Sequence, residues 1–309
     1  MSLLKRKRVL AAKVEATSGT AETLTNSEGS FNAYNVMAQA TIAVEERECQ
    51  GAFNYLPGVP GARTGTITFR TDIGWDGTNT EPTWASVLFP ACGYKGTTQL
   101  YTPVTEAPGN NVKTLTIGVY MDGQLKRLAG AMGTFQMVLP AGRMAYIDWT
   151  FTGVWQAPTS ASILSPTYPT ASPLRFASAT CSFASVAKKV EQVTIDVGNT
   201  VILREDGSTA AGYSTALITN RNPRITANPE AVGLATYDHY ATWLAANTGA
   251  FSISITGLVA NTSFDIAAGA AQIVNVQEGD RNGMIIEDIE FACTKNNTND
   301  NELTFDFNV

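Results

Sequence analysis

The chain has 309 residues, a formal net charge of −6 and a sequence pI near 4.9, so it is not expected to bind nucleic acid by neutralising phosphates. Charged residues make up only 16% of the chain, against about a quarter in an average globular protein. A surface poor in charge suits a protein that is covered by copies of itself, because desolvating unpaired charges is costly. A β-rich fold with threonine on its exposed faces would have a similar composition.

Cysteine and apolar patterns exclude several classes of protein. The four cysteines lie far apart, without the short spacings of a disulfide framework or a zinc site, and are expected to be small buried thiols in a reducing compartment: Cys49, Cys92, Cys181 and Cys293. Residues 1–16 contain no apolar run long enough for a signal peptide, and no segment approaches the about 18 apolar residues of a membrane span. We therefore expect the chain to stay in the cytoplasm after synthesis.

The first half of the chain opens with a polar segment and a long hairpin. Residues 1–30 are small and polar and predict a loop or an arm. Apolar and polar residues then alternate in segments that predict strands over about 32–48 and 66–70. The segment 50–64 between them contains Pro57-Gly58-Val59-Pro60-Gly61, too many breakers for a regular element, and predicts a projecting loop at the hairpin tip.

A helix, three strands and a linker follow. Apolar residues at helical spacing, with Pro82 at the start and Gly93 as a stop, predict a helix over 82–92. Turn signals separate three predicted strands, over 113–120, 133–139 and 144–153. From 156 to 173 the chain is rich in Pro, Ser and Thr, which predicts a linker.

The second half repeats this order of elements. Strands are predicted over 176–183, 189–197, 216–219, 251–256, 271–277, 284–293 and 303–307. A helix is predicted over 237–246, with Trp243 and Leu244 on its apolar face. Arg221 is expected to occupy the place that Arg70 holds in the first half, and the segment 197–211 corresponds to the Pro/Gly-rich loop.

Short sequence blocks also repeat. Ala129-Gly130-Ala131 precedes Met144 and Asp148 as Ala268-Gly269-Ala270 precedes Met284 and Asp288, at a shift of 139 to 140 residues. A repeat of this length predicts a tandem duplication of one fold. The predicted fold class is mainly β (α+β), with two tandem β-sandwich or rolled-barrel domains, each with one flanking α-helix. The predicted divisions are a first domain with an N-terminal arm over 1–157, a linker over 158–173 and a second domain over 174–309.

The sequence offers little for catalysis. His239 is the only histidine, which weakens any mechanism that needs a histidine base or ligand pair, and we expect it to be a satisfied core or surface residue. The segment 296–302 lacks the residue order of a calcium loop and predicts a hairpin tip. In a strand, Glu287 points away from Asp288 and Glu290, so these carboxylates do not form an acid/base pair. We predict no enzyme activity, cofactor or metal.

Carboxylates on predicted strands have a possible electrostatic use. Together they would give a concave sheet face a negative lining, although an ordinary solvated strand face explains any single one of them equally well. These residues are Glu45, Glu46, Glu48, Asp148, Glu191, Asp196 and Asp288.

Several segments resemble the tail tube proteins of long-tailed (siphophage-type) bacteriophages. Residues Arg6 to Ala21 contain a lysine-x-glutamate segment that runs into a Gly-Thr turn, as at the start of that family. Leu139-Pro140-Ala141-Gly142, with Ile147-Asp148-Trp149-Thr150-Phe151 and Ala157-Pro158-Thr159, looks like the final strand and exit turn of the family. The segments that are similar to its C-terminal region are 218–223, 228–230 and 301–305.

The resemblance implies a structural virion protein that self-assembles into stacked rings and forms the tail tube, the conduit for genome DNA. In this family the subunits join their sheets into an inner β-barrel, and a long hairpin loop reaches the adjacent ring. For a chain with two tandem tube domains, the resemblance implies homotrimeric rings with pseudo-sixfold symmetry, assembled in the host cytoplasm. The implied partners are the tape measure protein, the tail terminator and distal tail proteins, and DNA in transit without specific binding.

The resemblance also assigns candidate residues. The lumen would carry the strand carboxylates, whose negative charge would repel DNA phosphates. The Pro/Gly-rich segment takes the position of the inter-ring loop, and its candidate contact residues are Phe53, Tyr55, Leu56, Pro57, Val59 and Arg63.

Other readings stay open from the sequence alone. One is a different β-type virion component, such as a tail-tip or capsid-decorating protein, which would form discrete oligomers rather than stacks. Another is a hexameric ring in which the second domain decorates the outside. A third is a carbohydrate-binding or glycoside-cleaving β-sandwich, which would need exposed aromatic platforms from Trp75, Trp149 and Trp155.

Overall fold

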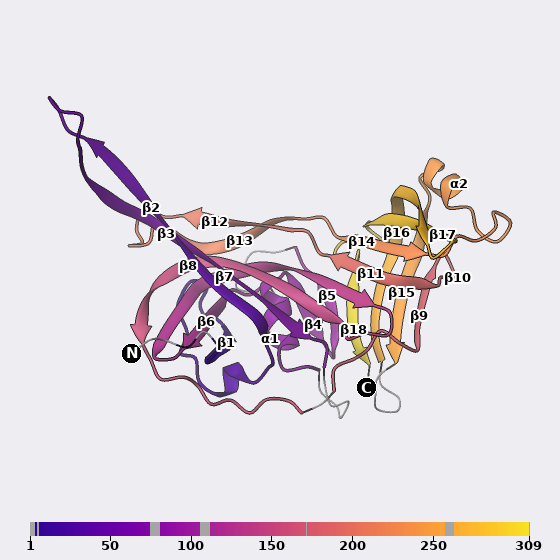
Figure 1. The fold of residues 1–309 in the computed structure, drawn as a ribbon, viewed down its shortest axis with the longest axis horizontal. Coiled ribbons are helices and arrows are strands. Elements are labelled where there is room, and N and C mark those ends of the chain that lie inside the picture. The colour runs from indigo at the N-terminus through magenta and orange to yellow at the C-terminus, as the bar shows by residue number, and fades with distance from the viewer. Residues whose placement is uncertain are drawn as a thin grey trace.

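The computed structural model of the chain describes residues 4, 6–74, 81–105, 112–170, 172–256 and 263–308. These residues form one 16-stranded antiparallel sheet and a separate two-stranded sheet, with two short α-helices (Figure 1). The prediction of a mainly β fold with a helix in each half is confirmed.

Six strands of the first half lie side by side in the order β1-β6-β7-β8-β3-β2. The short strands β4 and β5 pair with each other beside helix α1. The bounds of these elements are β1 Arg8–Val14, β2 Tyr34–Glu48, β3 Tyr55–Asp72, α1 Ala85–Ala91, β4 Tyr94–Thr97, β5 Leu100–Pro103, β6 Leu115–Met121, β7 Gln124–Pro140 and β8 Tyr146–Ser160.

Six strands of the second half lie in the order β9-β15-β16-β17-β14-β11. Counted in chain order within each set of six, the third strand, which precedes the helix, pairs with the sixth, and the first and second strands lie at the two ends. The bounds are β9 Ala179–Phe183, β10 Val186–Ala187, β11 Val190–Asp196, β12 Asn199–Glu205, β13 Tyr213–Arg221, β14 Arg224–Pro229, α2 His239–Leu244, β15 Thr248–Thr256, β16 Ser263–Arg281, β17 Met284–Cys293 and β18 Thr304–Asn308.

The two sets of strands are joined by pairing between β11 and β7. These strands are antiparallel, with Ile195 opposite Met137 and Asp196 opposite Gln136. The pairing makes a single sheet continuous from β10 to β2. Strand β18 makes a second connection, because it pairs with β16 on one side and β5 on the other.

Aromatic rings fill the centre of the first half. Phe89 of α1 packs against Phe135 and Trp149, whose ring centroids lie 5.3 and 5.7 Å from its own. Phe305 and Phe307 of β18 enter the same cluster, with centroids 5.5 and 6.4 Å from Phe89. The C-terminal strand of the chain thus completes a core built mainly by the first half, and one cluster of buried side chains runs through both halves.

Two expectations for the first half are wrong. Residues 1–30 are not only a loop or arm, since β1 lies in the sheet with Val9, Leu10, Ala11 and Ala12 all buried. The segment 50–64 is not a loop either, because β3 begins at Tyr55 and only the tip, 49–54, connects the strands. Pro57 and Pro60 are tolerated in β3 because that part of the strand has β2 alone as its partner among the described residues.

Three expectations for the second half also need correction. The segment 296–302 is not a hairpin tip, because β17 and β18 both pair with β16 and not with each other. Helix α2 is present, but Leu244 is 91% exposed and Trp243 38%, and its one buried residue is His239. Arg221 does not occupy the place of Arg70, because β3 pairs with β8 whereas β13 pairs with β12.

Arg221 instead fixes the segment between β17 and β18. Its Nε donates to Glu302 at 2.6 Å, and its Nη2 lies 3.2 Å from Asp300. The Arg221 side chain is 9% exposed, so the two acidic partners compensate for the desolvation of its charge. The acidic segment that follows β17 is therefore structural.

Candidate assembly surfaces

The outer part of the β2–β3 hairpin projects from the body of the protein (Figure 1). The last residue pair that holds β3 to β8 is Thr64 and Val154. Beyond it, β2 and β3 pair only with each other among the described residues, to the final pair Glu48 and Tyr55. A two-stranded ribbon that leaves its sheet has both faces open for contact with another molecule.

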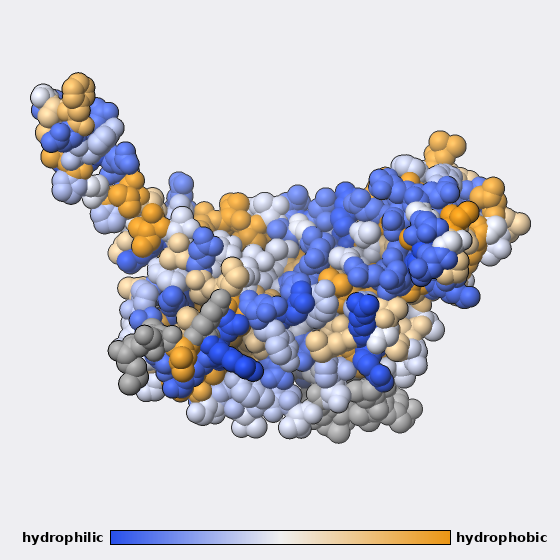
Figure 2. Space-filling model, viewed as in Figure 1, coloured by the Kyte–Doolittle hydropathy of each residue, from blue (hydrophilic) through white to orange (hydrophobic). Residues whose placement is uncertain are grey.

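Large apolar side chains are exposed along this projecting hairpin (Figure 2). Phe53 at its tip is fully exposed, and Tyr55 is 64% exposed. Contiguous exposed apolar surface marks sites of protein contact. The exposed apolar residues of the projecting part are Ile42, Val44, Phe53, Tyr55, Leu56 and Val59.

The candidate inter-ring residues divide between the tip and the root of the hairpin. Phe53, Tyr55, Leu56, Pro57 and Val59 lie on the projecting part. Arg63 lies at its root, where its backbone N–H donates to the Ala211 carbonyl at 3.1 Å. Sequence reasoning missed Ile42 and Val44 on the facing strand, because their alternation with polar residues is also the pattern of a half-buried strand.

The hairpin β12–β13 in the second half does not project in this way. It lies over β7 and β8, where Val201, Leu203 and Ile218 pack against buried Met132. The Asn199 side-chain amide donates to the carbonyls of Cys92 and Gly133 at 2.8 and 2.9 Å. The segment that corresponds to the projecting hairpin is therefore held against the first half.

Polar side chains form rows across one face of the large sheet. Directly opposed residues of an antiparallel sheet point to the same face. One row runs from β3 to β14 through Arg70, Asp148, Gln136, Asp196 and Arg224. The opposite face holds the buried aromatic core, so we call this one the polar face.

Carboxylates outnumber guanidiniums on the polar face. Arg70 and Arg224 are the cations of its central rows, and Arg70 donates to Asp148 through two bonds of 2.7 and 2.8 Å. Arg224 lies 3.7 Å from Glu290 of β17. The hydrogen bond that Arg70 donates to Asp148 is the main cause that raises the pKa of Arg70. The carboxylates of this face are Asp72, Asp148, Asp196, Asp288 and Glu290.

The structure brings only three of the predicted lumen carboxylates together on the polar face: Asp148, Asp196 and Asp288. Glu45, Glu46 and Glu48 lie on the projecting hairpin. Glu191 lies at the start of β11, where its carboxylate forms an ion pair with Arg281, 3.2 Å from Nε. The sequence did not identify Arg70 and Arg224 as part of this face, although both lie in the alternating pattern of their strands.

His239 is a satisfied core residue, as predicted. Its side chain is 1% exposed, with Nδ1 2.5 Å from Glu287 and Nε2 3.0 Å from the Lys188 ammonium. Burial, and after it the charge of Lys188, lower the pKa of His239 to about 4. A neutral ring can donate from Nδ1 and accept at Nε2, which matches both partners. The prediction that Glu287 points away from Asp288 and Glu290 is also confirmed, because Glu287 faces this cluster.

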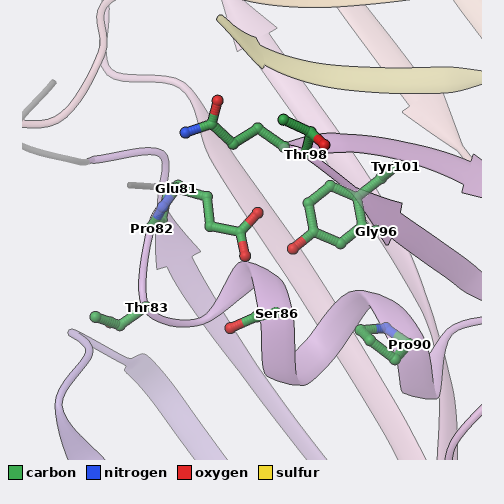
Figure 3. A pocket seen from close by; sticks show the side chains of 9 residues that line it. Glu81, Pro82, Thr83, Ser86, Pro90, Gly96, Thr98 and Tyr101 are labelled. Carbon is green, nitrogen blue, oxygen red and sulfur yellow. The ribbon is translucent and has the colours of Figure 1, made fainter. Parts of the chain in front are cut away.

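A pocket of about 650 Å³ lies beside α1 (Figure 3). Figure 3 shows the Glu81 carboxylate directed toward the hydroxyl of Tyr101. Burial, and then the hydrogen bond to Glu81, raise the pKa of Tyr101. Among the described residues that line it, Glu81 is the one carboxylate, so these residues do not supply the carboxylate pair of a glycosidase.

The two described tryptophans named as candidates for a sugar-binding platform are buried. Trp149 is 1% exposed and Trp155 is 6% exposed, so both belong to the core, and Trp75 lies outside the described residues. Within the described ranges, no group of three or more His, Cys, Asp or Glu could hold a metal ion. Over the same ranges, no helix is long and apolar enough to cross a membrane.

Comparison with known proteins shows a family match over most of the chain. A family model described as phage tail tube protein matches residues 5–293. None of the curated proteins matches the chain.

Proposed function

Because the chain belongs to the phage tail tube protein family, it is a structural component of the virion tail and not an enzyme, and we propose that three chains, each with two tube domains, form one ring of the tube. Membership of the family implies self-assembly into a tube. The number of chains in a ring, the two domains and the surfaces below are our proposal. The proposed domains are 1–157 and 174–309, with a linker over 158–173.

The pairing of β11 with β7 is the observation that carries this proposal. Strand β11 pairs with β14 at the base of the second-half β12–β13 hairpin, as the first part of β2 pairs with the last part of β3. Its pairing with β7 joins two sets of six strands that have the same order. We call the pairing of β11 with β7 the internal joint, because it joins the two sets of strands within one chain. A ring built from single-domain subunits needs a contact between neighbouring chains at each such joint. A duplicated chain makes every second joint internal, so three chains would provide six equivalent places.

The projecting β2–β3 hairpin supports a contact between rings. Its exposed apolar side chains would be covered if the hairpin lies against the next ring, which would remove an unfavourable apolar surface from water. The residues we assign to this contact are Phe53, Tyr55, Leu56, Pro57, Val59 and Arg63. Because β12–β13 is held against the first half, one such contact is expected for each chain.

The polar face supports an acidic lumen. Its carboxylates exceed its guanidiniums, so DNA phosphates would be repelled and would not adhere during transit. We assign Asp148, Asp196 and Asp288 to the lumen on this basis. Glu45, Glu46, Glu48 and Glu191 are kept as lumen candidates in the assembled tube, where the hairpins of several chains would surround the axis. DNA then passes without a specific binding site.

Other tail proteins would contact the two ends and the interior of such a tube. We propose the tape measure protein as the occupant of the lumen before DNA passes. The tail terminator and distal tail proteins would cover the two end rings, where projecting hairpins or the surfaces that receive them are left without a neighbouring ring.

Electron microscopy of the assembled protein tests the proposal. Purified chain at high concentration should form stacked rings, and averaging should give threefold symmetry with six similar lobes. A ring with six chains and twelve lobes would overturn the trimer. Discrete oligomers that never stack would overturn the tube contacts proposed here.

A further inference from the structure

Strands β2 and β16 each keep an unpaired backbone edge along part of their length among the described residues. Strand β2 pairs with β3 on one side and ends the sheet on the other. Strand β16 pairs with β17 over 271–281, but β15 covers its other side only as far as Gln272. Exposed edges are ready to pair with another chain, and closing them across subunits removes that exposure.

The internal joint between β11 and β7 gives a template for pairing these edges. Ile67 is opposite Phe151, and Ile225 is opposite Phe291. Phe151 and Phe291 are 140 residues apart, which is the shift of the sequence repeat, so Ile67 and Ile225 occupy corresponding positions. Ala38 is opposite Ile67 as Ile195 is opposite Ile225. Ala38 of β2 therefore corresponds to Ile195 of β11.

The same relation connects the other two strands. Met137 is opposite Ile147, and Glu278 is opposite Glu287. Ile147 and Glu287 are again 140 residues apart. Glu278 of β16 therefore corresponds to Met137 of β7. In the internal joint, Ile195 is opposite Met137.

We propose that β2 of one chain pairs antiparallel with β16 of the next chain, with Ala38 opposite Glu278 and Val36 opposite Asp280. This inference rests on the proposed ring of duplicated chains. It specifies the partner as a second copy of this chain and fixes the register of the contact.

The backbone groups at both edges have the orientation that this register needs. In an antiparallel strand, the N–H and C=O of one residue point to the same side and those of the next residue to the other. The Val36 carbonyl accepts a bond from Arg8 Nη1 at 2.7 Å, so it faces away from β3, and Ala38 faces the same way. Arg281 and Met284 flank the two-residue turn at Asn282-Gly283. In such a turn the flanking residues bond to each other, so the backbone N–H and C=O of Arg281 point toward β17.

It follows that Asp280 and Glu278 direct their backbone groups away from β17, toward the free side. The internal joint has the same alternation, because Val197 N–H donates to Phe135 O across β11 and β7 at 3.3 Å. Val197 and Ile195 share an orientation, as do Val36 and Ala38. Ala38, Glu278 and Asp280 thus direct their backbone groups toward the partner chain, and the Val36 carbonyl, which already accepts from Arg8, has a second lone pair for the contact.

Charge at the two edges is complementary. Arg8 lies at the β2 edge, and Arg6 lines the same surface hollow beside Asn35. The β16 edge carries the exposed carboxylates Glu278 and Asp280. Because the register places Asp280 opposite Val36, the Arg8 guanidinium would lie beside that carboxylate. Opposite charges at matching positions favour this pairing over β2 with β2 or β16 with β16.

A pair of cysteines tests the register. Gln39 and Gln277 correspond to Asp196 and Gln136, which are opposite each other in the internal joint, and both are exposed. Gln39→Cys with Gln277→Cys, in a Cys49→Ser background, should form a disulfide between chains in oxidised tubes, since opposed residues lie within disulfide reach. Non-reducing gels should show cross-linked dimers and trimers. A matched variant, Gln39→Cys with Glu278→Cys, should give at least about tenfold less cross-linked product.

Tubes that form normally but give no cross-link, or give equal cross-linking with the control, would overturn the register. Hydrogen exchange on the wild-type chain provides a measurement without substitutions. The amides of Ala38, Glu278 and Asp280 should exchange at least about tenfold more slowly in tubes than in the unassembled chain. Unchanged exchange at both edges in intact tubes overturns this inference alone, whereas failure to form tubes overturns the proposed function.

Discussion

Glu15 and Gly130 are joined by a hydrogen bond in which the Gly130 backbone N–H donates to the Glu15 carboxylate at 2.7 Å. The carboxylate is 4% exposed and also accepts from Thr114, Thr116 and the Gly19 backbone N–H, at 2.7 to 2.8 Å. Gly19 and Gly130 both have positive φ, of 82° and 58°. The lysine-x-glutamate segment and the Gly-Thr turn of the family resemblance are therefore parts of one buried anchor.

Replacing this carboxylate should destabilise the fold. Glu15→Gln keeps the shape of the side chain but replaces one carboxylate oxygen, an acceptor, with an NH₂ group, a donor. This group would face the N–H and O–H donors that bond to Glu15, so buried polar groups would be left unsatisfied. We expect a loss of about 1–3 kcal/mol in the free energy of unfolding, measured by urea denaturation. Glu22→Gln, at a partly buried carboxylate nearby, is the matched control and should change stability by less than about 1 kcal/mol. Equal effects would contradict the anchor role.

The buried histidine should make stability depend on pH. The pKa of His239 is lowered to about 4 from an ordinary 6.5, so the unfolded chain binds more protons between these values. Its contribution is complete above pH 6.5 and is lost as the pH falls toward 4, by at most about 1.4 kcal/mol per pH unit. The raised pKa of Glu287 acts in the opposite sense at the lower end of this window. The steepest loss should therefore fall between about pH 5 and 6.

Urea denaturation between pH 5 and 7.5 measures this effect. His239→Gln removes the titrating group while its amide can still donate to Glu287. The variant should be less stable than the wild type at pH 7.5, and its stability should change less between pH 7 and 6. Parallel curves for the two proteins would show that another group controls the dependence.

The sequence predicted the elements whose local pattern is unambiguous. The helix before Gly93 and the strand pairs around Asp148 and Asp288 have clear periodicity, and they form as expected. Strand β1 was missed because Val9 to Ala12 are buried on both faces, and a continuous apolar run of four residues shows no alternation. Pairing between distant strands, such as β11 with β7, leaves no local signal at all.

The candidate surfaces were predictable only in part. Exposed Leu244 and Trp243 have the same helical spacing as core residues, so sequence cannot distinguish a helix that packs inward from one that offers its apolar side to a partner. Likewise, Asp148 was identified as a strand carboxylate, but its bond to Arg70 depends on the register of β3 against β8. That register is a property of the whole sheet.

Removing the aromatic tip of the projecting hairpin should stop ring stacking without unfolding the chain. Phe53 and Tyr55 are exposed, so Phe53→Ser with Tyr55→Ser should leave the melting temperature within about 2 °C of the wild type. Burial of one such ring in a contact contributes about 1.5–3 kcal/mol, so losing two should weaken stacking at least about 100-fold. Electron microscopy should show single rings in place of tubes.

An exposed apolar residue away from the hairpin provides the comparison. Leu244→Ser on α2 removes a side chain that is 91% exposed and should leave tube length unchanged if the hairpin makes the inter-ring contact. Tubes of normal length from the hairpin variant would contradict the assignment. Loss of tubes in both variants would point to a stacking surface that includes α2.

Reversing the charge of the polar face should make the tube retain DNA. Asp288 and Gln277 are opposite each other on β17 and β16, and both are exposed, so Asp288→Lys with Gln277→Lys adds two cations to that face without a buried cost. If this face lines the lumen, short DNA should bind the variant tubes at low salt. The logarithm of the binding constant should fall linearly with the logarithm of the salt concentration, with a slope of about −0.9 for each phosphate contacted. Asp288→Asn removes a carboxylate without adding a cation and should not create binding. Variant tubes that exclude DNA as the wild type does would show that the polar face lies elsewhere in the assembly, because a lumen lined by added lysines must attract phosphates.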